Sequence, residues 1–172
     1  METNKISRIS LIAMDVDGVL TDGSIIFGSG GLESKRFFVR DGHGIKLAQR
    51  AGLKIAFITG RSSEVTERRA AELGVSDVYQ NAHRKLEPFR ELLGKYSLDS
   101  SQVCYIGDDV VDIPVMRNSG FSVAVADAAS EVCAVADYVT NKPGGRGAVR
   151  EVIEVILKSK KLWEKVTGRY YE

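Results

Sequence analysis

The chain has 172 residues, of which 44% are apolar and 27% are charged, and its formal net charge is +1. This length predicts a single domain spanning residues 1–172, and the balanced charge argues against a nucleic-acid partner bound over a broad basic face. No apolar run approaches the ~18 residues of a membrane-spanning helix, and the polar start is unlike a signal peptide, so we expect a cytoplasmic protein with no membrane partner.

Short apolar runs rich in β-branched residues alternate along the chain with helical patterns. In chain order, the predicted strands are 9–14, 54–58, 78–79, 103–106, 121–125 and 138–140. The predicted helices are 44–51, 63–73, 86–96, 111–118 and 148–158, with one or two further helical turns at 129–135. Continuous apolar strands that alternate with helices form parallel sheets covered on both faces, so we predict a doubly wound (Rossmann-like) α/β fold.

One segment interrupts this alternation. Residues 23–40 read GSIIFGSGGLESKRFFVR, two β-like runs around a Gly/Ser-rich tip, which predicts a β-hairpin insertion after the first strand. Its apolar side chains are numerous, and a two-stranded hairpin alone is marginal in water. We therefore expect it to pack on the body of the domain or on another subunit. Residues 163–172 are predicted as a frayed end or a docking segment.

Polar side chains follow the carboxyl ends of four predicted strands. In chain order they are Asp15 and Asp17, Thr59 and Arg61, Lys85, and Asp108, Asp109 and Asp112. Open parallel sheets bind ligands at this edge. Because crowded carboxylates repel one another unless a cation joins them, and Mg²⁺ prefers oxygen ligands, the pattern predicts a Mg²⁺ site.

These side chains suit phosphoryl transfer. Asp15 can attack phosphorus to form an aspartyl-phosphate, and Asp17 can protonate the leaving alkoxide and then deprotonate water. The Thr59 hydroxyl and the Lys85 ammonium suit the non-bridging phosphoryl oxygens.

The predicted metal ligands are Asp15, Asp17, Asp108 and Asp109, with Asp109 acting directly or through water. For Asp112, a role at the site and a role as an acidic residue at a helix start remain equally open.

The segments DVDGVLTD and GDDVVD, with Thr59 and Lys85 between them, resemble the four motifs of the haloacid dehalogenase superfamily of aspartate-nucleophile phosphotransferases. RDGHGIKLAQ, ITGRSSEVTERR, SVAVADA and GGRGAVREV narrow the resemblance to phosphatases of 3-deoxy-D-manno-octulosonate 8-phosphate (KDO 8-phosphate) over residues 9–157. The resemblance implies a capless, Mg²⁺-dependent enzyme of lipopolysaccharide biosynthesis. It also implies a homotetramer in which the hairpin helps to build the assembly and a neighbouring subunit partly covers each active site.

The resemblance also implies substrate contacts. Asp17 and Lys85 would meet the phosphate, and the sugar acid would meet Phe38, Val39, Arg40, Asp41, Gly42, Lys46, Arg61 and Arg69, some of them across a subunit boundary. Arginine offers bidentate recognition of a carboxylate. Simpler roles remain open, because Arg40 and Asp41 can shape a turn and Arg69 can belong to a charged helix face.

Two other functions remain open at this stage. One is a phosphatase of the same superfamily for a nine-carbon ulosonate 9-phosphate, although related enzymes of that kind carry Glu at the position of Arg61. The other is a receiver-like signalling module, which also combines acidic residues, Thr and Lys around a phospho-Asp. Receiver modules are phosphorylated after the third strand, whereas here the acidic pair Asp15 and Asp17 follows the first.

Overall fold

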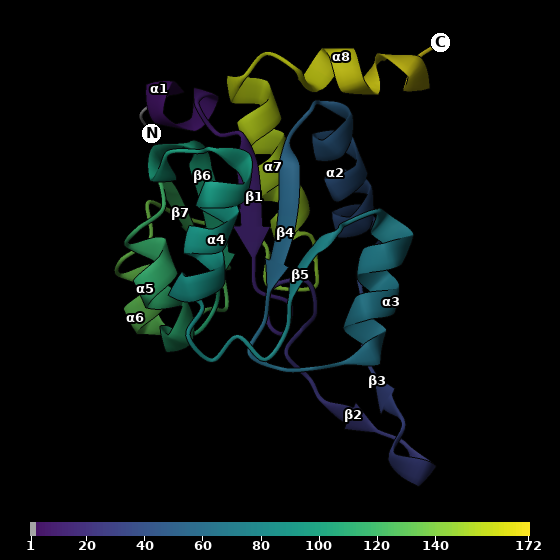
Figure 1. The fold of residues 1–172 in the computed structure, drawn as a ribbon. Helices are drawn as coiled ribbons and strands as arrows, with labels where there is room; N and C mark the ends of the chain where they lie inside the picture. The colour runs from purple at the N-terminus through teal and green to yellow at the C-terminus, as the bar shows by residue number, and fades with distance from the viewer. Residues whose placement is uncertain (1–2) are drawn as a thin grey trace.

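Six parallel strands form the central sheet of the computed structural model, which describes residues 3–172 (Figure 1). Across the sheet the strand order is β5-β4-β1-β6-β7-β8. The strands are β1 (Leu11–Met14), β4 (Lys54–Ile58), β5 (Asp77–Tyr79), β6 (Val103–Gly107), β7 (Phe121–Ala124) and β8 (Tyr138–Val139). The predicted doubly wound parallel sheet is therefore confirmed, with small shifts at the strand ends.

The central strand β1 marks the point where the chain reverses its direction across the sheet. Met14 lies opposite Phe57 of β4 on one side and opposite Ile106 of β6 on the other. The chain first builds outward through β4 and β5, and then returns to add β6, β7 and β8. The carboxyl ends of β1 and β6 therefore form the topological switch point, where sheets of this kind bind ligands.

Helices cover both faces of the sheet (Figure 1). One face packs against α2 (Val39–Arg50), α3 (Glu64–Leu73) and α7 (Ala148–Ser159). The other packs against α4 (Leu86–Tyr96), α5 (Ile113–Met116) and α6 (Ser130–Cys133). Within residues 3–172, none of these helices has the length and apolarity needed to cross a bilayer.

Alternate residues of each strand enter opposite halves of the core. Ile12 and Met14 belong to the cluster beneath α2 and α7, whereas Leu11 and Ala13 belong to the cluster beneath α4. All four side chains are fully buried. Burial on both faces explains why the strands read as unbroken apolar runs in the sequence.

Helix α2 begins at Val39 rather than at residue 44 as predicted. Gly42 and Gly44 are weak helix formers, which hid the first turn. In the fold, Gly44 lies against the backbone of Arg150 in α7, and a glycine lets two helices approach this closely. Packing between helices therefore outweighs local propensity here.

Three further segments differ in detail from the prediction. The predicted helix 111–118 divides into a 3-10 turn, η3 (Val110–Asp112), followed by α5. Residues 163–172 contain α8 (Trp163–Thr167) and η4 (Gly168–Tyr170), and α1 (Thr3–Ser7) was not predicted. In Figure 1, α1 and α8 lie at the end of the sheet opposite the carboxyl ends of the strands.

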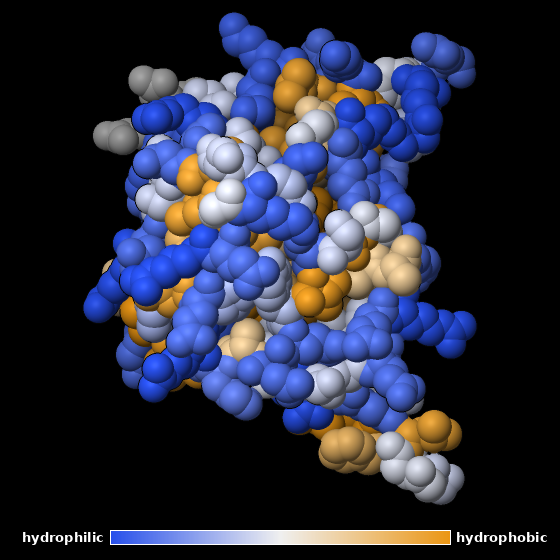
Figure 2. Space-filling model, in the orientation of Figure 1, coloured by the Kyte–Doolittle hydropathy of each residue, from blue (hydrophilic) through white to orange (hydrophobic). Residues whose placement is uncertain are grey.

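The predicted hairpin consists of β2 (Ile26–Phe27) and β3 (Glu33–Ser34), joined through η1 (Ser29–Gly31). It projects from the carboxyl-end side of the sheet, and Figure 2 shows apolar atoms gathered at its tip. Phe27 is 69% exposed and Leu32 is 71% exposed, so this tip does not pack on the body of the domain. Within the described residues no separate domain lies between β1 and α2, in agreement with the capless arrangement.

Candidate active site

A cavity of about 310 Å³ lies at the switch point of the sheet. Its lining contains almost every polar side chain that the sequence placed after a strand: Asp15, Asp17, Thr59, Arg61, Lys85, Asp108 and Asp109. Gly60, Ala82, His83 and Val111 complete it. The topology of the sheet thus brings together residues that are up to about ninety positions apart in the chain.

Lys85 lies at the centre of the buried part of the site. Its ammonium is 2.8 Å from Oδ2 of Asp15 and 2.8 Å from Oδ1 of Asp112. Burial opposes the charge on Lys85, but the two carboxylates raise its pKa overall. Lys85 therefore remains a cation held between two carboxylates.

Asp15 occupies the first position after β1. Its Oδ1 accepts a 2.6 Å hydrogen bond from the backbone N–H of Val16, and its Oδ2 contacts Lys85. Burial raises the pKa of Asp15 to about 6, against the attraction of Lys85 and with added repulsion from Asp112. A carboxylate with this environment ionises readily once a further positive charge is near.

Asp112 is fully buried and uses both of its oxygens. Oδ1 accepts hydrogen bonds from Lys85 and from the Tyr105 hydroxyl, at 2.8 Å and 2.7 Å. Oδ2 accepts from the backbone N–H groups of Asp108 and Asp109, at 3.0 Å and 3.3 Å. Asp112 therefore joins Lys85 to the loop after β6 and holds that loop in place.

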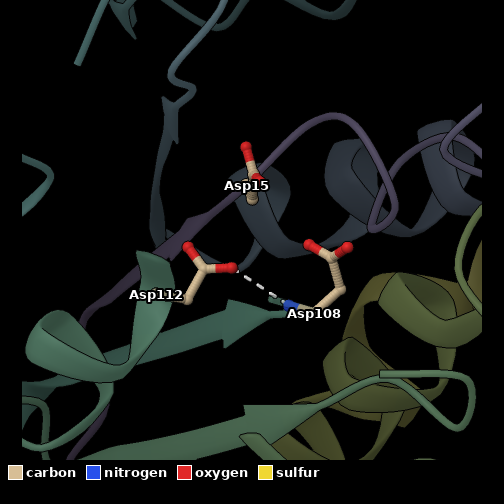
Figure 3. Close-up of side chains that lie close together, drawn as sticks. All are labelled: Asp15, Asp108 and Asp112. Carbon is tan, nitrogen blue, oxygen red and sulfur yellow. Dashed lines mark hydrogen bonds between the residues drawn. The ribbon is translucent and has the colours of Figure 1, made fainter. Parts of the chain in front are cut away.

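Asp15, Asp108 and Asp112 bring carboxylate oxygens within 4.8 Å of one another (Figure 3). Oδ1 of Asp108 is buried and has no hydrogen-bond partner among the residues that the structure describes. Burial, followed by repulsion from Asp15 and Asp112, raises the pKa of Asp108 to about 7. An unpartnered buried carboxylate oxygen beside two others fits a hard divalent cation.

Gly18 lies directly against the carboxylate of Asp108. Its φ is +93°, and a Cβ at this position would collide with the Asp108 carboxylate. Only glycine combines this backbone conformation with such a close approach.

Two of the predicted metal ligands lie outside the group of three carboxylates. Asp109 uses Oδ1 to accept the backbone N–H of Val110, and it is exposed. Asp17 makes ion pairs with Lys35 and Arg61 instead. Their assignment as ligands stays a prediction, whereas Asp112, left open by the sequence, lies within the group.

Asp17 and Arg61 meet two side chains that sequence reasoning missed. Lys35, just after β3, places Nζ 2.5 Å from Oδ1 of Asp17. Glu33, in β3, accepts a 2.9 Å hydrogen bond from Nη2 of Arg61, whose Nε lies 3.8 Å from Oδ2 of Asp17. The available signal was the charged run ESKR at residues 33–36, which stands between the two apolar runs of the hairpin.

Several residues that were predicted to contact the sugar acid lie outside the lining of the 310 Å³ cavity. Phe38 and Arg40 line a second cavity, of about 700 Å³, together with Arg146 and Arg150. Val39 is 79% exposed.

Asp41 and Gly42 contact residues of other helices in the same chain. Asp41 is buried and accepts the backbone N–H groups of Gly147 and Arg150 at the start of α7, while burial raises its pKa. Gly42 packs against the guanidinium of Arg69.

Arg69 also lies 5.5 Å above the ring of Phe37 and forms an ion pair with Glu72. Lys46 is exposed on α2. Neither Arg69 nor Lys46 is part of the described lining of the 310 Å³ cavity, so their contacts with substrate stay predictions.

Comparison with known proteins defines the class. A sequence model of the family described as haloacid dehalogenase-like hydrolase matches residues 71–153. This match agrees with the doubly wound sheet and with the acidic cavity at its switch point. Fold and site together therefore define a haloacid dehalogenase-like hydrolase.

Individual relatives within this class identify the family of the chain more closely. The chain is 46% identical over 165 residues to 3-deoxy-D-manno-octulosonate 8-phosphate phosphatase KdsC of Escherichia coli K12, covering 96% of this chain and 88% of the relative. The enzyme of the same name from Moraxella catarrhalis, solved with magnesium, phosphate and KDO, matches with a TM-score of 0.95 and 43% identity over 98% of this chain and 97% of that one. The Haemophilus influenzae phosphatase in its cobalt-bound form matches with a TM-score of 0.91 and 37% identity, over 97% and 98% of the two chains. The chain belongs to the 3-deoxy-D-manno-octulosonate 8-phosphate phosphatase family.

Proposed function

We propose that this protein is a Mg²⁺-dependent phosphatase that hydrolyses KDO 8-phosphate to KDO and inorganic phosphate for lipopolysaccharide biosynthesis. The observation that carries the proposal is the placement of Asp15 after β1, hydrogen-bonded to Lys85 in a cavity that also holds Asp108. The family membership supports the same activity.

In the first half of the reaction, a carboxylate oxygen of Asp15 bonds to phosphorus while the bond from phosphorus to the sugar oxygen breaks. Asp17 donates a proton to that leaving oxygen. In the second half, Asp17 takes a proton from water, and the water oxygen displaces Asp15 from phosphorus. Thr59 and Lys85, both buried at the cavity, hold the non-bridging oxygens.

Asp15 and Asp108 are the residues best placed to hold Mg²⁺, because each has a cavity-lining carboxylate and the pKa of each is raised. When bound, the ion supplies positive charge that offsets the repulsion between these carboxylates and the phosphoryl group. Asp109 is the further proposed ligand from the same lining, and the carboxylate of Asp17, which lies beside it in that lining, is kept for proton transfer.

We also propose that the sugar acid is bound by Arg61, which recognises its carboxylate, and by Phe38–Gly42, Lys46 and Arg69, some of these contributed by a neighbouring subunit. The exposed apolar tip of the hairpin supports association of subunits through this segment, and we propose that the assembly is a homotetramer located in the cytoplasm. Replacing Phe27 with Ser is expected to shift the mass measured by analytical ultracentrifugation towards smaller species. The variant Val139→Ser, on an exposed position of β8, is the control and keeps the wild-type mass. An unchanged mass for Phe27→Ser contradicts this assembly.

The decisive experiment is a phosphate-release assay on eight-carbon and nine-carbon ulosonate phosphates, with Mg²⁺ and with a chelator. We expect the highest kcat/KM on KDO 8-phosphate and loss of turnover in the chelator. A preference for the nine-carbon substrate would reassign the enzyme to that substrate, and equal activity in the chelator would remove the metal from the proposal.

A further inference from the structure

The stem of the hairpin reaches back to the cavity through one buried ammonium. The side chain of Lys35 is only 2% exposed, although the hairpin around it projects from the domain. Its Nζ lies 2.5 Å from Oδ1 of Asp17. A buried cation loses its hydration, so Lys35 depends on the Asp17 carboxylate for compensation, and this dependence holds the two side chains together.

The two oxygens of Asp17 therefore differ. Oδ1 is engaged by Lys35, whereas Oδ2 is buried and has no hydrogen-bond partner among the described residues. Arg61 does not donate a hydrogen bond to Oδ2, because its Nε lies 3.8 Å from that oxygen. Its Nη2 instead donates to Oε1 of Glu33 at 2.9 Å. The hairpin thus holds one oxygen of Asp17 and leaves the other available.

We propose that Lys35 is a positioning residue for proton transfer: by holding Oδ1 of Asp17, it presents Oδ2 as the oxygen that exchanges a proton with the substrate. This inference rests on the proposed phosphatase function. The proton on Oδ2 passes to the leaving oxygen as the bond to phosphorus breaks, and Oδ2 later recovers a proton from the attacking water. Lys35 itself keeps its protons throughout.

Positioning of a proton donor has a signature that depends on the leaving group. An alkoxide needs protonation as it leaves, whereas a p-nitrophenolate leaves readily without it. In Lys35→Met, we expect kcat on KDO 8-phosphate to fall by roughly 10- to 100-fold, a part of the 10²–10⁴-fold that a general acid contributes. Turnover of p-nitrophenyl phosphate should fall by no more than about 3-fold, with KM for both substrates nearly unchanged.

Three variants sharpen the test. Arg36→Met is the matched control, because Arg36 is the exposed neighbouring cation, and it should keep wild-type kinetics. Lys35→Gln retains an N–H donor near Oδ1 and should recover part of the lost turnover. This variant also replaces Lys35→Met in the test if the methionine variant folds poorly. In an Asp17→Asn background, Lys35→Met should add no further loss, because both changes disable the same step.

A series of aryl phosphates with increasing leaving-group pKa completes the experiment. In Lys35→Met, or in Lys35→Gln, the rate should fall more steeply along this series than in the wild type. Equal losses at every leaving group would overturn the inference and make Lys35 a phosphate ligand or a purely structural residue. If the wild type does not hydrolyse KDO 8-phosphate, the proposed substrate fails, while the aryl series still tests Lys35 separately.

Discussion

The two sides of the cavity are built differently. On the sheet side, Lys85, Asp15 and Asp112 are buried among strand ends, and the Lys85 side chain is 2% exposed. On the hairpin side, Asp17 and Arg61 contact an inserted segment, and the Arg61 side chain is 40% exposed. The proposed bond-breaking groups therefore belong to the core, whereas proton transfer and substrate selection depend on an addition to it. Changes on the sheet side should affect stability as well as activity, and changes on the hairpin side should affect activity alone.

The largest effect on activity is expected at Asp15, which is both the proposed nucleophile and a buried residue at the end of β1. Asp15→Asn removes the nucleophile but keeps an oxygen that can accept the Val16 N–H bond. Phosphate release should fall by roughly 10⁴-fold or more, with circular dichroism unchanged. Substantial activity in a preparation shown by mass spectrometry not to have reverted to Asp would remove Asp15 from the nucleophile role.

Asp112→Ala tests the claim that the sheet side is part of the core. The change leaves Tyr105 and two backbone N–H groups without an acceptor and deprives Lys85 of one carboxylate. We expect the free energy of unfolding to fall by about 3–5 kcal/mol in urea titrations, together with loss of turnover. Asp99→Ala is the control, because Asp99 also accepts a backbone N–H but is exposed, and it should cost about 1 kcal/mol. Equal costs would contradict the claim that Asp112 is part of the buried core of the domain.

Arg61→Ala tests the opposite side. Loss of a charge-assisted hydrogen bond to the sugar-acid carboxylate should raise KM for KDO 8-phosphate by about 10- to 100-fold. Hydrolysis of p-nitrophenyl phosphate and the melting temperature should change little. The exposed Arg68 provides the control variant Arg68→Ala, expected to be silent. Parallel losses on both phosphates would argue against a role of Arg61 in specificity.

The smallest effect concerns pH and metal. In the metal-free protein the pKa values of Asp15 and Asp108 are raised to about 6 and about 7, above their ordinary value of 3.8. The folded state then keeps protons that the unfolded state has lost, so this contribution to stability is present below pH about 4 and is lost as pH rises to about 7. Mg²⁺ should reverse the trend, because it binds the ionised carboxylates of the folded state.

Melting temperatures at about pH 5 and about pH 8, in chelator and in Mg²⁺, measure this effect. We expect Mg²⁺ to raise the melting temperature more at the higher pH. Asp108→Asn should reduce both the pH slope and the response to Mg²⁺. A Mg²⁺ response that is larger at the lower pH would contradict the assignment of these carboxylates.

The fold class and most of the cavity lining could be predicted from the amino-acid pattern. A residue that directly follows a buried parallel strand must lie at the carboxyl edge of the sheet, so Asp15, Thr59 and Asp108 could be placed from local pattern alone. Lys85 was predicted at the same edge because it follows the short strand β5, although it does not follow that strand directly. The hairpin could also be predicted from the sequence, because its apolar runs and Gly-rich tip are local features.

The pairing of charged residues could be seen only in the folded structure. Asp41 accepts hydrogen bonds from Gly147 and Arg150, more than a hundred residues away, and Lys35 reaches Asp17 only because the hairpin folds back on the sheet. Such pairings depend on how separate elements pack, and a charged residue in a sequence has the same local signature whether it faces water, a backbone N–H or a catalytic carboxylate. Local periodicity is a property of one segment, whereas the partner of a buried charge is a property of two.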